Sequence, residues 1–176
     1  MAEATTKLAT VTGSGNPATL SFTSISQSYD DLIVMGIGAD TSTAAAQLYI
    51  DIQFYNDTGS NYCYGNGSVT TSNTRGIAVE GNQTQIRTHQ PGSQNSEEAF
   101  GFLYMYIPRY TTTSYAKQVW FSDGFVCQQN GTQSTNVYAA WGVWNNTAAI
   151  NEIDLKCLFG TFKTESKFTL YGVKNS

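Results

Sequence analysis

The chain has 176 residues, of which only 12% are charged, and its formal net charge at pH 7 is −4. Its nine Lys and Arg residues are scattered and form no basic cluster, which argues against binding to nucleic acid or to an anionic membrane surface. Thr, Ser, Asn and Gln fill 63 positions, so we expect a surface built mainly from neutral hydrogen-bonding side chains.

The order of β-branched, aromatic and turn residues predicts an all-β chain, since no long segment has an apolar stripe at helical spacing. We expect about eight or nine strands. In chain order they cover residues 18–25, 31–38, 47–55, 61–64, 98–107, 115–126, 136–144, 149–159 and 167–173.

Two of these segments indicate how the strands are buried. In 47–55 the residues Leu48, Ile50, Ile52 and Phe54 alternate with more polar ones, so this set is expected in a core. In 98–107 both alternating sets are apolar, which predicts a central strand or a strand lying under a subunit contact.

Short strands at roughly ten-residue spacing favour an antiparallel β-sandwich of the jelly-roll type, formed by a single domain over residues 18–176. Residues 1–17 are predicted to form an N-terminal arm, with Ala2–Pro17 as a docking or strand-exchange segment whose deletion leaves the domain folded. The polar stretch from Gly65 to Glu98 is expected to hold loops, short edge strands or a binding surface.

Targeting and redox signals are few. The chain has no run long enough to cross a bilayer and no secretory leader pattern at its start, so we expect synthesis in the cytoplasm and no membrane partner. The three cysteines, Cys63, Cys127 and Cys157, have no C-x-x-C spacing and are predicted to be reduced, partly buried thiols rather than a disulfide framework or a zinc site.

The sequence offers little for catalysis. The single histidine, His89, cannot supply a multi-His metal set, and no G-x-S-x-G motif accompanies it, so it is interpreted as a loop residue. A glycoside hydrolase needs two facing carboxyl groups. The two carboxyl groups of each adjacent pair, Asp30-Asp31 and Glu97-Glu98, point to opposite faces of a strand. This leaves four acids on predicted strands that could converge in space: Asp51, Asp123, Glu152 and Asp154. We therefore predict no enzyme, no catalytic residues, no cofactor and no metal site.

Several weaker signals have plain structural readings. The segment Asp57–Asn61 has oxygen donors at alternate positions, as in half of a calcium loop, but a turn closed by Asx hydrogen bonds is favoured. The glycines of Gly13-Ser14-Gly15 and Gly65-Asn66-Gly67 are interpreted as turns. The five Asn-x-Ser/Thr triplets are expected from composition alone, and they begin at Asn56, Asn66, Asn82, Asn130 and Asn145.

Six blocks of sequence, taken together, resemble small jelly-roll virion structural proteins of tailed bacteriophages, mainly marine ones. The resemblance runs from about residue 10 to the C-terminus, and the chain departs from the family pattern in the Gln-rich segment 80–98. The blocks are Phe22–Ile25, Tyr29–Leu32, Phe54–Tyr62, Tyr106–Tyr110, Ala148–Ile153 and Phe168–Val173.

The resemblance implies a non-enzymatic role on a particle surface. Our first hypothesis is a capsid decoration, or cement, protein: a homotrimer on the outer surface of the virion head that binds the major capsid protein. The alternative is a tail-fibre or tail-tip module whose partners are tail proteins and host glycans. Its sugar platform would be formed by Trp120, Trp141 or Trp144 and by amides of the 65–98 region. The resemblance assigns no ligand-binding residue, so that site remains unknown.

Overall fold

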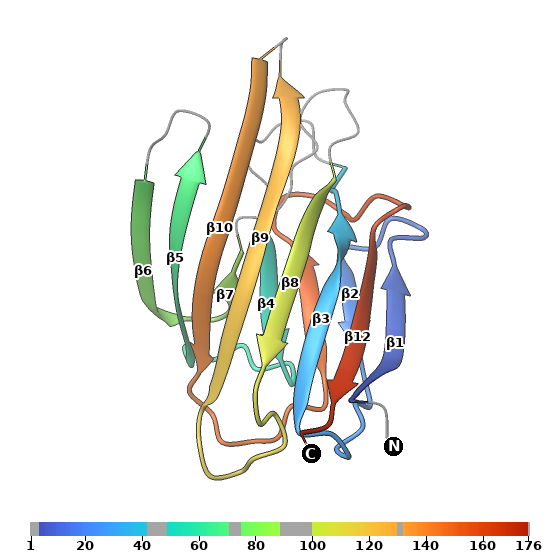
Figure 1. The fold of residues 1–176 in the computed structure, drawn as a ribbon, viewed down its shortest axis with the longest axis vertical. Helices are drawn as coiled ribbons and strands as arrows, with labels where there is room; N and C mark the ends of the chain where they lie inside the picture. The colour runs from blue at the N-terminus through green and yellow to red at the C-terminus, as the bar shows by residue number, and fades with distance from the viewer. Residues whose placement is uncertain (1–3, 42–48, 71–74, 89–99, 130–131, 176) are drawn as a thin grey trace.

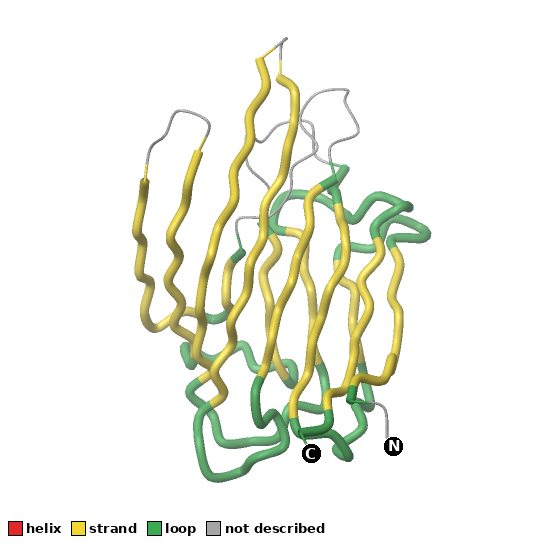
Figure 2. The backbone as a smooth tube through the Cα atoms, in the orientation of Figure 1, coloured by secondary structure: helices red, strands yellow, loops and turns green. Residues whose placement is uncertain are grey.

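The fold is all-β and consists of two packed sheets. The computed structural model describes residues 4–41, 49–70, 75–88, 100–129 and 132–175. Over these residues the chain forms twelve strands, every pairing between them is antiparallel, and no helix occurs (Figure 2). No described element could therefore serve as a membrane-spanning helix.

The larger sheet has eight strands in the order β1-β12-β3-β8-β9-β10-β5-β6, and the smaller has four in the order β2-β11-β4-β7. In Figure 1 the larger sheet lies in front of the smaller one. The strand bounds are β1 Thr5–Thr12, β2 Thr19–Phe22, β3 Asp31–Gly38, β4 Ile50–Phe54, β5 Tyr62–Thr70, β6 Arg75–Gln83, β7 Ile86–Arg87, β8 Gly101–Ile107, β9 Lys117–Gln129, β10 Thr132–Trp144, β11 Ile153–Cys157 and β12 Lys167–Val173.

The topology is that of a jelly roll with two added hairpins. When β5–β6 and β9–β10 are set aside, two facing four-stranded sheets remain, ordered β1-β12-β3-β8 and β2-β11-β4-β7. Their strands change sheet at every step along the chain except from β4 to β7, which is the double Greek-key path of a jelly roll. The hairpins extend the first sheet beyond β8, and β9 and β10 reach past their neighbours at one end (Figure 1). The predicted sandwich of the jelly-roll type is thus confirmed.

The strands match the sequence prediction most closely where both ends carry turn signals. The bounds of β3 and β12 agree with it, whereas the predicted polar region contains most of β5 together with β6 and β7. The glycines Gly65 and Gly67 lie inside β5, so their interpretation as a turn is wrong. Gly13 does belong to a turn, because its carbonyl accepts a hydrogen bond of 2.8 Å from the backbone N of Asn16.

About half of the segment predicted as an N-terminal arm is a strand in this fold, because β1 covers eight residues of it. β1 pairs with β12 along nearly its whole length, and Leu8, Ala9 and Val11 pack against the core. The alternation of exposed Thr and Lys with these apolar residues explains this, because such a pattern, rich in β-branched side chains, fits a half-buried pleated surface. Deleting the segment would remove these contacts and expose the edge of β12.

The core lies between the two sheets. Its inward side chains come from both layers, as the alternation predicts for 47–55: Ile50, Ile52 and Phe54 are buried. At one end, Trp144 is fully buried between Phe54 and Tyr62, with ring centroids 5.7 and 6.3 Å away. Large rings in such a position contribute much of the buried area of a small sandwich.

Candidate functional site

The outer face of the larger sheet, meaning the face turned away from the smaller sheet, is apolar over much of its area. The alternation along β8 shows why. Leu103, Met105 and Ile107 are buried in the core, so Phe102 and Tyr104 point to the other side, where each remains about two-fifths exposed.

Cross-strand register places the outward residues of six strands in two parallel rows. Residues directly opposite each other in an antiparallel pair share a face. One row runs through Ile33, Tyr106, Trp120, Trp141, Gly65 and Val79, and the next runs through Met35, Tyr104, Ser122, Ala139, Gly67 and Ile77. The rows cross from β3 to β6, and the first is apolar along its length, whereas Ser122, Ala139 and Gly67 separate the large apolar side chains of the second.

Nine of the twelve large hydrophobic side chains exposed in the described part of the chain lie on this one face. An aromatic side chain covers about 150–250 Å² when fully buried, and if the aliphatic ones are given the lower end of that range, the exposed parts of the nine side chains sum to on the order of 900 Å². We call this surface the outer apolar face. Its members are Met35, Ile37, Ile77, Val79, Phe102, Tyr104, Trp120, Val137 and Trp141.

Trp120 and Trp141 form its centre. They are directly opposite each other on β9 and β10, and their exposed fractions are 56% and 40%. A cavity of about 380 Å³ lies on one side of the pair, lined also by Tyr104, Ser122 and Ala139. A smaller cavity of about 160 Å³ lies on the other side, toward Gln118 and Val143. The two indoles therefore stand between two shallow hollows.

The position of Trp141 depends on a glycine beneath it. A Cβ atom at Gly65 would come within 2.4 Å of the Cζ2 atom of the Trp141 ring. The indole thus lies against the backbone of β5, in space that any larger residue would fill. This explains why glycine occurs inside a strand, where it usually weakens the sheet.

Trp144, the third predicted sugar platform, is not on this surface. It is fully buried, and its Nε1–H donates a 2.7 Å hydrogen bond to Asp57 Oδ2. The structure brings together two of the three predicted tryptophans and places the third in the core.

The segment Asp57–Asn61 is a turn, as the sequence favours. The carboxylate of Asp57 accepts bonds from the backbone N of Gly59 at 2.8 Å, from Asn61 Nδ2 at 2.9 Å and from the indole of Trp144. Partial burial acts to raise the pKa of Asp57, but these hydrogen bonds outweigh it and hold the pKa below its usual value. Both carboxylate oxygens are thereby engaged by donors of the protein itself.

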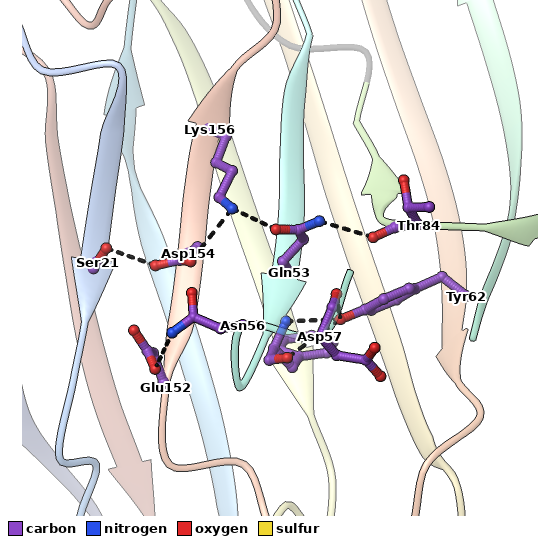
Figure 3. A network of polar contacts seen from close by, with 10 residues as sticks. Ser21, Gln53, Asn56, Asp57, Tyr62, Thr84, Glu152, Asp154 and Lys156 are labelled. Atoms are coloured by element: carbon purple, nitrogen blue, oxygen red, sulfur yellow. Dashed lines mark hydrogen bonds and ion pairs between the residues drawn. The ribbon is translucent and has the colours of Figure 1, made fainter. Parts of the chain in front are cut away.

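The outer face of the smaller sheet has the opposite character. Figure 3 shows a chain of polar contacts across it, from Ser21 through Asp154 and Lys156 to Gln53 and Thr84. Ser21 Oγ donates a 2.6 Å bond to Asp154, and Lys156 Nζ lies 3.6 Å from the same carboxyl group. The two outer faces of the sandwich therefore differ: one is polar and internally bonded, and the other is apolar.

The four acids considered for hydrolysis do not meet at one place. Asp51 and Asp154 share the smaller sheet, where Asp51 binds Arg87 through bonds of 2.7 and 3.0 Å. Glu152 accepts a bond from Asn56 Nδ2 at 2.9 Å (Figure 3), whereas Asp123 is buried on β9 of the larger sheet. Each of Asp51, Asp154 and Glu152 is thus held by its own neighbours, and Asp123 is on another sheet.

The remaining sequence candidates add no further site. Within the described ranges, no three His, Cys, Asp or Glu side chains are grouped as a metal would require. His89 and the pair Glu97-Glu98 lie outside the described residues. Cys63 is exposed and Cys157 is partly buried, neither of them in a disulfide, and burial raises the pKa of Cys157 to about 12.

Sequence reasoning identified the tryptophans but missed most of the outer apolar face. Met35, Ile37 and Ile77 gave no motif. The available signal was the apolar character of both alternating sets in 31–38 and 98–107, which requires cover on two sides.

Comparisons with family models, with curated proteins and with solved structures give no match to this chain. Its function is therefore inferred from the geometry of its own surface.

Proposed function

We propose that this chain is a non-enzymatic structural protein of a phage virion, acting as a capsid decoration protein on the outside of the head. In this proposal it forms a homotrimer that binds the major capsid protein and ties neighbouring capsid subunits together. The observation that carries the proposal is the outer apolar face, because a contiguous patch larger than about 300–600 Å² on a soluble protein marks an interaction surface.

The mechanism is stabilisation by binding. A protein that binds only the assembled lattice stabilises it by its own binding free energy, and no chemical step is needed. The low charge of the chain suits this role, since contacts made of apolar groups and neutral hydrogen bonds are not screened by salt.

The proposal is tested with virion heads prepared with and without this chain. We expect heads that carry it to resist heat and low salt better than bare heads, and the purified chain added back to restore that resistance. Equal resistance of both preparations would refute the cement role.

One observation favours the second candidate, a tail module that binds host carbohydrate. Trp120 and Trp141 stand exposed between two hollows, and aromatic rings beside shallow cavities can stack on the apolar faces of sugar rings. Labelling of the tail rather than the head, together with micromolar binding to bacterial surface polysaccharides that is lost in Trp120→Ala, would favour this candidate. The control Trp120→Phe keeps a ring in place and should retain part of the binding.

A further inference from the structure

The outer apolar face is too large to remain in contact with water. Its nine side chains leave on the order of 900 Å² of apolar surface uncovered, above the largest patch of a typical monomer and close to the roughly 800 Å² that one partner contributes to a stable interface. A covering partner is therefore required.

We infer that this partner is a second copy of the same chain, and that copies of the protein meet through the outer apolar face. The inference deepens the proposed function, on which it rests, by assigning the surface that joins the subunits. Interfaces between identical subunits are more apolar than those between proteins that meet only transiently. None of the nine side chains that form the face is ionisable except Tyr104, so the patch offers no charge by which a different, charged partner would be selected.

The time at which the face must be covered also favours a second copy. An apolar patch of this size would promote aggregation from the moment the chain folds, whereas a lattice partner is met only later. Identical chains are present together at synthesis and can cover each other at once.

The edge of the sheet supports the same occupant. β6 is the last strand of the larger sheet, and its Ile77 and Val79 are 83% and 70% exposed, the two highest values on the face. A long edge strand with exposed apolar side chains is a site at which sheets associate. The face and this edge are continuous, so one contact between copies covers both.

The experiment measures the mass of the purified chain by light scattering and sedimentation, with three variants. Trp120→Lys places a charge at the centre of the face, and Ile37→Lys places one toward its β3 side. Phe159→Lys is the matched control, because Phe159 is 53% exposed, as Trp120 is 56%, and follows β11 of the smaller sheet. All three positions are about half exposed, so we expect the variants to fold, with unchanged β-sheet circular dichroism.

We expect the unaltered chain and Phe159→Lys to be oligomers at micromolar concentration. Trp120→Lys should weaken association at least about 100-fold, because residues at the centre of an interface carry most of its binding energy, and Ile37→Lys should weaken it in the same direction. The inference would be overturned if the unaltered chain were still monomeric at about 100 micromolar. So would an oligomer that both face variants leave intact.

A second measurement needs no substitution. Trp120 and Trp141 are on the face and Trp144 is buried in the core, so dissociation on dilution should shift tryptophan emission to the red and raise acrylamide quenching. Dissociation with unchanged emission would place the contact elsewhere and overturn the inference.

The cement role and the self-association through the outer apolar face can be refuted independently of each other. If the chain is monomeric yet still binds heads, or binds polysaccharide through Trp120, the self-association is refuted while a binding role stands. If copies associate through the face but the oligomer leaves heads unprotected, the cement role is refuted and the inference holds.

Discussion

Two residues after β4 adopt a backbone conformation that most side chains avoid. Tyr55 and Asn56 have φ angles of 55° and 52°, and the backbone N of Asp57 donates a 2.9 Å bond to the carbonyl of Phe54. Positive φ at both central residues defines a type I′ turn, in which Asn and Gly are favoured. Asn56 fits this position, whereas Tyr55 is strained.

Tyr55→Asn is therefore expected to stabilise the protein by about 0.5–1 kcal/mol, because Asn tolerates the left-handed region better and the Tyr55 ring is half exposed. Urea denaturation measures the free energy of unfolding. The control Tyr115→Asn changes another exposed tyrosine that does not have positive φ, and it should give no gain. A loss of stability in Tyr55→Asn would show that its side-chain contacts outweigh the backbone strain.

At the scale of elements, the two added hairpins turn a jelly roll into a sheet with a broad outer face. Trp120, Val137 and Trp141 belong to β9 and β10, and Ile77 and Val79 to β6. The remaining strand, β5, contributes Gly65 and Gly67 to the two outward rows. The ring of Trp141, from β10, lies against Gly65. The hairpins thus supply five of the nine side chains of the outer apolar face and, at Gly65, the space that the Trp141 ring occupies.

Gly65→Ala is expected to destabilise the protein by about 1–3 kcal/mol, because the new methyl group must displace the Trp141 ring. Gly67→Ala is the matched control in the same strand, where the nearest atom to a new Cβ is 3.9 Å away. Thermal unfolding compares the two, and the emission of Trp141 should change only in Gly65→Ala. Equal stability of both variants would show that the indole moves at little cost.

At the scale of the whole molecule, the buried carboxylate of Asp31 joins three distant parts of the chain. It accepts hydrogen bonds from the hydroxyl of Tyr106 at 2.7 Å, the backbone N of Arg109 at 2.8 Å and Asn175 Nδ2 at 2.8 Å. Burial acts to raise the pKa of Asp31, but the hydrogen bonds prevail and lower it below its usual value. The bond to Asp31 in turn raises the pKa of Tyr106 to about 12.

Because the pKa values of Asp31 and Asp57 are lower in the folded chain than in the unfolded one, both carboxylates stabilise the fold above about pH 4, the unfolded value. That stabilisation is lost as the pH falls through the folded values. Urea denaturation at several pH values should show Asp31→Asn to be about 1–3 kcal/mol less stable than the parent at pH 7 and less sensitive to acid.

Glu165→Gln is the control for this measurement, since it also removes one carboxylate but at an exposed position. Its acid profile should follow that of the unaltered chain. If Asp31→Asn kept the full acid slope, other groups would be responsible for it.

The all-β class, the sandwich of the jelly-roll type and the bounds of strands such as β3 and β12 could be predicted from the amino-acid sequence alone. These follow from local rules: an alternation of period two, β-branched residues and turn signals at both ends of a segment. The apolar residues on both faces of 98–107 also indicated that this strand is covered on two sides.

Which side chains gather on one face depends on how the strands pair in the folded chain. Trp120, Trp141 and Trp144 look alike in the sequence, yet strand register places the first two opposite each other on the surface. Trp144 is an odd number of residues along β10 from Trp141, so its side chain points to the opposite face of the strand, into the core. Gly65 resembles a turn residue until its neighbour across the sheet is known. Such pairings join residues far apart in the chain, and local propensity carries no information about them.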